Sequence, residues 1–363
     1  MERALRESEM LVIYGLMQDA NLTDSALARR CGMKESTVSS IRRRLMDSKH
    51  IYFANTPSFH RLGCQIFVQL YGSTNPAVPK DVKDAAHQRF LDETPEIFDS
   101  ASGEGFVMMS GVYRDFSDYL VTIDRYERAF AGIRAAERTD LKAAFYPMSI
   151  SKVCNTYNFA PGLHRIFGLD VPKPASNRPV RQETACAALS LMERRTLVHL
   201  TEYPNATDAQ IAQLMGRSRQ TVTNVRKCLL KKGMYTRTCI IPLVLWNIEL
   251  IAYVHLKFRP DVEPSLREEL SNGDWVNLSW YTLERSAEAS ATYMFRDYKD
   301  YLVEMQRMMK PLIESDVLRG DPTISLISTA AAKELRDGYY GPMVRKLVGF
   351  GDETPRSAYP SGF

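Results

Sequence analysis

The feature that most constrains this chain of 363 residues is an internal duplication. A shift of 184 positions aligns NLTDSALARRCGMKESTVSSIRRRL with NATDAQIAQLMGRSRQTVTNVRKCL without a gap, and nine of the 25 positions are identical. Average residue usage would give about one or two identities over such a length by chance. YRDFSDYL and FRDYKDYL match at a shift of 182, and FAPGLHRIFG and YGPMVRKLVG match at 181. The chain therefore repeats one fold, with small differences in loop length between the two copies.

Each repeat begins with a pattern typical of a helix–turn–helix unit. In repeat 1, apolar residues recur with a helical period over 9–19, and 21–24 then offer capping side chains for a second helix. Gly32 stands where that helix must end in a left-handed turn. We predict a third helix over 35–48 and its counterpart after a capping Ser218. The buried positions of these helices are expected to be Val38, Ile41 and Leu45 in repeat 1, and Val222, Val225 and Leu229 in repeat 2.

The outward faces of the two third helices carry side chains that can read DNA. Arginine fits guanine, glutamine and asparagine fit adenine, and serine or threonine can contact phosphates or bases. From Arg217 to Arg237 there are seven basic residues and no acidic one, which suits a phosphate backbone. The net charge is +2 over residues 1–60, +6 over 188–247 and −4 elsewhere. The candidate DNA-binding residues are Lys34, Glu35, Ser36, Thr37, Ser39, Ser40, Arg42, Arg43 and Arg44, with Arg217, Ser218, Arg219, Gln220, Thr221, Thr223, Asn224, Arg226, Lys227, Lys231 and Arg237.

The remainder of each repeat predicts an α/β domain. The short alternating segments KHIYFANTPSF and KGMYTRTCIIP are consistent with a β-wing that follows the third helix. Strand-like and helix-like segments then succeed one another in the order β-α-β-β-α-β, a split βαβ, ferredoxin-like pattern. In repeat 1 they are 64–72, 82–91, 96–103, 105–113, 115–136 and 141–150; in repeat 2 they are ELIAYVHLKF, 264–270, WVNLSWYTLE, ASATYMF, 297–314 and TISLIS.

These features predict a mixed α/β (α+β) fold and the boundaries of its domains. Winged helix–turn–helix units are expected over 1–60 and 188–245, and ferredoxin-like domains over 61–170 and 246–350. A polar, Pro-rich linker over 171–187 and a flexible tail over 351–363 complete the chain.

The doubled arrangement resembles the Lrp/AsnC group of transcription regulators, and more closely the tandem winged-helix regulators of methanogenic and related archaea. The resemblance implies a sequence-specific regulator that binds double-stranded DNA and is not an enzyme. Because the two third helices differ, the operator is expected to be an imperfect pair of half-sites. The α/β domains are where a small-molecule effector of unknown identity would bind and where two chains would form a homodimer.

Two other functions compete with this interpretation. Some Lrp-like proteins with a similar layout are siroheme decarboxylases of tetrapyrrole metabolism, and they need a basic or His-lined pocket for a polycarboxylate. The candidate residues for such a pocket are His164, Arg165 and Arg285. The third interpretation is a protein-interaction scaffold without DNA binding, which the basic third helix of repeat 2 disfavours.

Other chemical signals are weak. Gly103 and Gly105 are too few for a dinucleotide fingerprint, and we expect no metal or cofactor site. No stretch suits a membrane span and no signal peptide is expected, which predicts a cytoplasmic protein. The recurring pairs Asp118–Tyr119 and Asp300–Tyr301 favour packing or assembly, as do the strand aromatics Trp275, Trp280 and Tyr281. The six histidines are interpreted as wing, surface or packed residues: His50, His60, His87, His164, His199 and His255.

Overall fold

The fold is given by a computed structural model. The structure describes residues 5–103, 105–133, 140–155, 157–169, 180–181, 186–270, 272–279 and 281–350. The tail over 351–363, most of the expected linker and Trp280 therefore lie outside the described residues.

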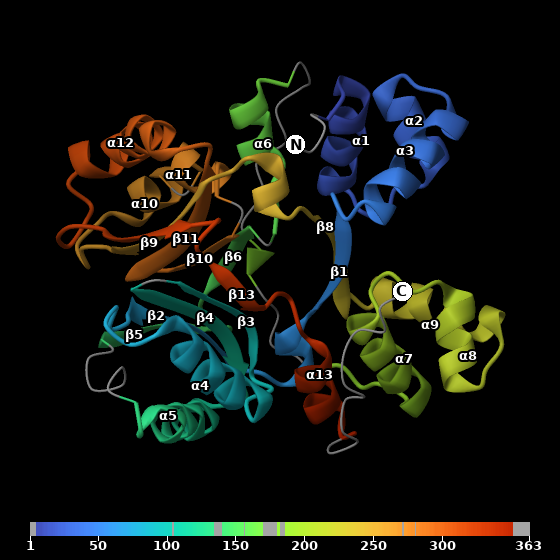
Figure 1. The fold of residues 1–363 in the computed structure, drawn as a ribbon, viewed down its shortest axis with the longest axis horizontal. Coiled ribbons are helices and arrows are strands. Elements are labelled where there is room, and N and C mark those ends of the chain that lie inside the picture. The colour runs from blue at the N-terminus through green and yellow to red at the C-terminus, as the bar shows by residue number, and fades with distance from the viewer. Residues whose placement is uncertain are drawn as a thin grey trace. The chain divides into compact units, whose positions relative to one another are not determined.

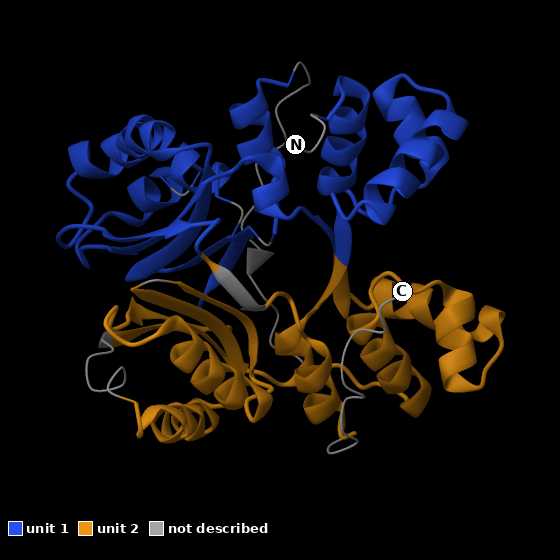
Figure 2. Ribbon diagram, viewed as in Figure 1, with its two compact units in different colours: residues 1–53, 150–181, 238–331 blue, residues 54–149, 182–237, 332–363 orange. Residues whose placement is uncertain are grey.

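The chain divides into two compact units, and each unit combines parts of both repeats (Figure 2). Unit 1 consists of Met1–Phe53, Ile150–Arg181 and Thr238–Ala331. It thus joins the helix–turn–helix segment of repeat 1 to the α/β domain of repeat 2. Unit 2 consists of Ala54–Ser149, Gln182–Arg237 and Ala332–Phe363, which is the complementary combination.

The α/β domain of unit 2 has the predicted ferredoxin-like order. Its elements are β2 (Ile66–Ser73), α4 (Lys80–Asp92), β3 (Ile97–Gly103), β4 (Phe106–Tyr113), α5 (Phe116–Phe130) and β5 (Asp140–Pro147). The strands lie in the antiparallel order β3-β4-β2-β5, and α4 and α5 cover one face of the sheet (Figure 1). Val68, Met109 and Phe90 lie in the core between that face and the helices.

The α/β domain of unit 1 repeats this arrangement. Its elements are β9 (Leu250–Lys257), α10 (Pro264–Leu270), α11 (Asp274–Asn277), β10 (Tyr281–Arg285), β11 (Glu288–Phe295), α12 (Tyr298–Glu314) and β12 (Thr323–Ser328). The strand order β12-β9-β11-β10 matches that of unit 2. The prediction of one strand over WVNLSWYTLE was wrong, because its first half forms the short helix α11. Trp275 is buried there in the core, where its indole Nε1 donates to the Leu270 carbonyl at 2.6 Å.

Each sheet is extended by a strand from the other repeat. In unit 1, β6 (Lys152–Asn155) pairs antiparallel with β10, and β7 (Val180–Arg181) pairs with β6. In unit 2, β13 (Lys333–Arg336) pairs antiparallel with β3. The Arg336 guanidinium stabilises the pairing of β13 with β3, because it donates hydrogen bonds to the Thr94 and Ile97 carbonyls at 2.8 and 2.6 Å. Two repeats of one sequence have thus exchanged equivalent strands.

The predicted three-helix segments are present in both units. They are α1 (Glu7–Gln18), α2 (Asp24–Cys31) and α3 (Glu35–Asp47) in unit 1, and α7 (Leu191–Glu202), α8 (Asp208–Met215) and α9 (Arg219–Lys231) in unit 2. The Thr23 and Thr207 side chains cap α2 and α8, and Gly32 and Gly216 end these helices at φ +64° and +60°. The predicted buried positions are confirmed except for Val225, which is half-buried.

The predicted wings are not formed as hairpins. Each segment contributes one strand, β1 (Tyr52–Pro57) or β8 (Tyr235–Ile240), and these two strands pair with one another. Within unit 2 the Ser58 amide beyond β1 donates to the Met234 carbonyl before β8 at 2.9 Å. Short 3-10 turns follow the strands at Phe59–Leu62 and Leu243–Trp246. Alternation predicted the strands correctly but cannot specify their partner.

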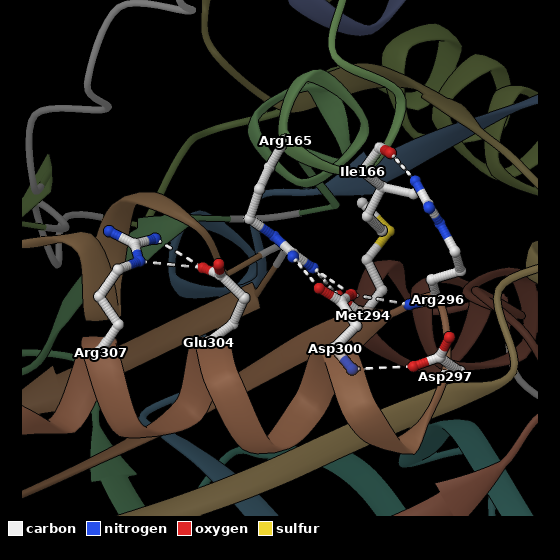
Figure 3. A network of polar contacts seen from close by, with 8 residues as sticks. All are labelled: Arg165, Ile166, Met294, Arg296, Asp297, Asp300, Glu304 and Arg307. Atoms are coloured by element: carbon white, nitrogen blue, oxygen red, sulfur yellow. Dashed lines mark hydrogen bonds and ion pairs between the residues drawn. The ribbon is translucent and has the colours of Figure 1, made fainter.

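One further helix per repeat joins the parts of each unit. These are α6 (Ala160–Phe167) in unit 1 and α13 (Gly341–Val348) in unit 2, the two copies of the third sequence match. Arg165 on α6 forms a bidentate ion pair with Asp300 on α12, at 2.5 and 3.0 Å, and donates to the Met294 carbonyl at 3.1 Å (Figure 3). In unit 2, Arg345 on α13 pairs with Glu202 on α7.

Candidate functional site

A line of polar side chains lies on one face of the unit 1 sheet. The Tyr253 hydroxyl and Ser290 Oγ are 2.8 Å apart, and Ser290 Oγ is 3.2 Å from His255 Nδ1. The other ring nitrogen, His255 Nε2, is 3.3 Å from Glu288 Oε2. Arg285 then donates to Glu288 Oε1 from Nε at 2.9 Å and from its terminal amino group at 2.7 Å. We call these five residues the sheet network.

Strand register brings the sheet network together. His255 on β9 lies directly opposite Ser290 on β11, and Glu288 lies opposite Arg285 across the β10–β11 hairpin. Their neighbours Val254 and Ala289 point to the opposite face, where they lie in the core under the helices. The sheet network therefore occupies the face turned away from α10, α11 and α12.

The exposure of the side chains increases along the sheet network, from Tyr253 to Arg285. Tyr253, Ser290 and His255 are 0%, 1% and 3% exposed, whereas the Arg285 side chain is 29% exposed. Burial alone would raise the pKa of Glu288, but hydrogen bonds from His255 and Arg285 outweigh it and the pKa is lowered. Glu288 is therefore held as a carboxylate beside the His255 imidazole.

The equivalent face of unit 2 lacks this chemistry. At the positions that correspond to His255 and Tyr253, β2 carries Tyr71 and Gln69. The counterparts of Glu288, Ser290 and Arg285 are Phe106, Met108 and Gly103. The two α/β domains therefore share the same arrangement of strands, but this set of polar side chains is present in unit 1 and absent from the equivalent positions of unit 2.

The sequence interpretation placed His255 among packed or surface residues and missed the sheet network. The signal was present in YVHLK and EASAT, where polar residues alternate with apolar ones on two strands. Of the three polycarboxylate candidates, Arg285 belongs to the sheet network. Arg165 is held by Asp300, and the His164 ring lies 6.2 Å from the Tyr14 ring. The structure therefore does not join His164 and Arg165 to Arg285 in one site.

The basic residues of the third helices are divided between internal ion pairs and an exposed face. Arg42 on α3 pairs with Asp24 at 3.1 Å, and Arg226 on α9 pairs with Asp208 at 2.8 Å, so the duplication has preserved this contact. Arg44 pairs with Glu9 at 2.5 Å. The half-buried candidates are Arg42, Thr221, Thr223, Arg226 and Arg237, and the exposed ones are Lys34, Glu35, Ser36, Thr37, Ser39, Ser40, Arg43, Arg44, Arg217, Ser218, Arg219, Gln220, Asn224, Lys227 and Lys231.

A cleft lies beside the third helix of unit 2. It has a volume of about 440 Å³ and is lined by Thr207, Asp208, Ala209, Arg219 and Arg226. The Thr223 hydroxyl and Arg226 both contact Asp208 on one side of the cleft. Arg226 thereby compensates the negative charge of the Asp208 carboxylate. Arg219 is left as an exposed cation at the start of α9.

Two negative findings apply to the part of the chain that the structure describes. It contains no group of three or more His, Cys, Asp or Glu side chains that could hold a metal ion. None of its helices is long and apolar enough to cross a membrane.

Comparison with known proteins identifies similar structures but no family. No protein-family model matches the chain, and no curated protein sequence matches it. The siroheme decarboxylase NirDL matches over 95% of this chain and 99% of its own, at 10% identity and a TM-score of 0.49. Its complex with an iron-uroporphyrin III analogue matches over 94% of this chain and 99% of its own, with the same identity and TM-score.

Transcription regulators match a smaller part of the chain. An AsnC family regulator from Agrobacterium tumefaciens covers 39% of this chain and 90% of its own, at 16% identity and a TM-score of 0.32. LrpC from B. subtilis covers 40% of this chain and 95% of its own, at 14% identity and a TM-score of 0.31. The fold itself is mixed α/β with antiparallel sheets. The prediction that the chain is not an enzyme is corrected, because the neighbours that match nearly its whole length are those of an enzyme.

Proposed function

We propose that the chain is an Lrp-like enzyme of tetrapyrrole metabolism that removes carboxyl groups from a siroheme-type polycarboxylate. The observation that carries the proposal is the sheet network of unit 1, which joins an imidazole, a carboxylate and a guanidinium in hydrogen-bond contact. The substrate class is that of the siroheme decarboxylases, which were a competing interpretation of the sequence. It is also the class named for the neighbours that match nearly the whole chain.

Decarboxylation of such a substrate requires groups that bind its carboxylates and a group that donates a proton. Loss of CO2 from an acetate side chain leaves an electron pair on the carbon, and a proton must fill that position to give a methyl group. No net oxidation or reduction takes place. The site therefore needs cations that bind the carboxylates and a positioned acid that supplies the proton.

Each role has a candidate in the sheet network. His255 is the candidate proton donor, the Glu288 carboxylate orients its ring, and Ser290 and Tyr253 continue the hydrogen-bond chain. Arg285 sits at the more exposed end. The exposed Lys257 lies opposite Glu288 on β9 and adds a second cation for the substrate's carboxylates.

The test is incubation of the full chain with siroheme in the absence of oxygen. We expect products that are lighter by one CO2 for each carboxyl group removed, at a rate proportional to protein concentration. Recovery of unchanged siroheme, or products formed at the same rate without the protein, would contradict the enzymatic function.

We infer a second property, DNA binding, from the exposed face of α9. Arg219, Lys227 and Lys231 are exposed on α9 and Arg217 is exposed just before it, whereas α3 has two of its three arginines in internal ion pairs. The exposed face of α9 therefore offers more cations to a phosphate backbone than that of α3. An operator with two unlike half-sites remains a proposal that follows from the different third helices.

Replacement of Arg219 and Lys227 by alanine is expected to weaken binding to duplex DNA of random sequence. The slope of log K against log salt should fall by about one for each phosphate that the variant no longer neutralises. Fluorescence anisotropy over a salt series measures this slope. Arg43→Ala on α3 is the matched control and is expected to change the slope less. Equal slopes for all three proteins would exclude α9 as the DNA-binding face.

A further inference from the structure

Two hydroxyls form the buried end of the sheet network. The Tyr253 and Ser290 oxygens are 2.8 Å apart, and Ser290 Oγ lies 3.2 Å from His255 Nδ1. All three side chains are at most 3% exposed. Ser290 on β11 lies directly opposite His255 on β9, so the pairing of the two strands keeps the hydroxyl beside the ring.

The charge on Glu288 determines which ring nitrogen of His255 carries hydrogen. Although burial opposes it, hydrogen bonds from His255 and Arg285 lower the pKa of Glu288, so this group is a carboxylate that only accepts hydrogen bonds. His255 Nε2 is 3.3 Å from Glu288 Oε2 and therefore carries hydrogen. In the neutral imidazole the other nitrogen, Nδ1, then has no hydrogen and is an acceptor.

These assignments give the pair of hydroxyls one direction. A serine hydroxyl has a single hydrogen, and Ser290 donates it to Nδ1 of the neutral His255 ring. Toward Tyr253 the Ser290 oxygen can therefore only accept, so the Tyr253 hydroxyl is the donor in that contact. The ring is thus hydrogen-bonded at both nitrogens, to a hydroxyl on one side and to a carboxylate on the other. Such partners favour one tautomer and one orientation of the ring.

The α/β domain of unit 2 shows that the fold does not require these two hydroxyls. At the positions equivalent to Ser290 and Tyr253 it carries Met108 and Gln69, and its strands pair in the same register. Of the two domains, the one with the serine and the tyrosine is the one with His255. This difference favours a role of the hydroxyls toward the ring over a role in forming the sheet.

We propose that Ser290, itself oriented by Tyr253, is a positioning residue that donates to His255 Nδ1 and holds the imidazole in its Nε2–H form and in one orientation. In the imidazolium both nitrogens donate, so the Ser290 hydrogen turns to the Tyr253 oxygen and the Tyr253 hydrogen turns away. When the ring gives up the proton on Nδ1, both hydroxyls turn back. The consequence for turnover rests on the proposed decarboxylation, whereas the hydrogen-bond assignment does not.

Nitrogen-15 NMR of the full chain labelled at histidine tests this assignment without substrate. The spectrum of His255→Ala identifies the signals of His255. In the neutral wild-type ring we expect hydrogen on Nε2 and, at Nδ1, the shift of an unprotonated nitrogen that accepts a hydrogen bond. Ser290→Ala should move the Nδ1 signal to the position of an unprotonated nitrogen without that bond, and Ser290→Thr, which keeps the hydroxyl, should restore it. Tyr253→Phe should move the signal less, because Ser290 still donates.

Thr292→Val is the matched control, because it removes a buried hydroxyl from the same face of β11 outside the sheet network. It should leave both His255 signals unchanged. Hydrogen on Nδ1 of the neutral wild-type ring, or an Nδ1 signal that Ser290→Ala does not move, would overturn the proposal. The spectra are read whether or not siroheme is decarboxylated, so this result is distinct from failure of the proposed function.

Kinetics with siroheme then measure what the positioning contributes. Ser290→Ala is expected to lower kcat about tenfold at an unchanged KM, the effect of losing one hydrogen bond to the ring. Ser290→Thr and Thr292→Val should keep the wild-type kcat. An active chain in which Ser290→Ala moves the Nδ1 signal but leaves kcat unchanged would show that Ser290 does not position the proton donor.

Discussion

Replacement of His255 by alanine is expected to lower kcat for CO2 release from siroheme by a factor of about 10² to 10⁴, the usual contribution of a positioned general acid. His255 is 3% exposed and lies between Ser290 and Glu288, so the alanine variant loses the proton donor between these two groups. KM should change little, because the imidazole is not one of the cations assigned to the substrate's carboxylates. Steady-state kinetics with siroheme separates the two parameters.

The duplication supplies a matched control for this variant. Tyr71 occupies in β2 the position of His255 in β9, and Tyr71→Phe removes only a hydroxyl. Its kcat should equal that of the wild type. Glu288→Gln keeps the size of the side chain but removes the negative charge beside the imidazole, so it is expected to lower kcat in the same assay. An unchanged kcat in His255→Ala would remove the sheet network from the mechanism.

Acid is expected to destabilise unit 2 through His87 on α4. This side chain is 1% exposed, and its ring lies edge-on to Phe130 at 5.0 Å between centroids. Within the described residues neither ring nitrogen has a hydrogen-bond partner. Burial lowers the pKa of His87 from 6.5 to about 4; the nearby Asp84 raises this pKa by a smaller amount and Lys83 lowers it further.

The sign of the effect follows from proton linkage. The unfolded chain binds a proton at His87 below pH 6.5, whereas the folded chain does so only below about 4. The stability that the folded state owes to the pKa difference at His87 is therefore fully present above pH 6.5 and is lost as the pH falls toward 4. This loss lowers the free energy of unfolding by about 3 kcal/mol.

Denaturant unfolding of the wild type and of His87→Leu measures this contribution. The difference in unfolding free energy between the two proteins should shift in favour of the variant by about 3 kcal/mol between pH 7 and pH 4. A difference that stays constant with pH would show that His87 is protonated in the folded state or is not buried there.

Local sequence patterns predicted the elements well because the forces that form them are local. The caps Thr23 and Thr207 and the turn glycines Gly32 and Gly216 determine where helices begin and end. The β-α-β-β-α-β order followed from periodicity and from the two repeats. Trp275 was misplaced because a short apolar run fits a strand and a buried helix equally well.

Long-range pairing could not be predicted in the same way. No sequence pattern in β13 indicates that it pairs with β3. The exchange of strands between the two repeats was therefore not predicted. The same limit explains the sheet network, since His255, Ser290 and Glu288 become a site only through the register of β9 with β11. Conversely, Arg42 and Arg226 were expected on an open face, and the structure shows that their ion pairs with Asp24 and Asp208 recur with the duplication.

The most direct test of the proposed decarboxylation is product analysis after reaction of siroheme in D2O. We predict that the wild-type chain yields products in which CO2 has left and one deuterium has entered each new methyl group, with no change in oxidation level. His255→Ala should give these products far more slowly, and Tyr71→Phe should give them at the wild-type rate. Unchanged siroheme with the wild-type chain, or equal rates for the wild type and His255→Ala, would contradict the proposed mechanism.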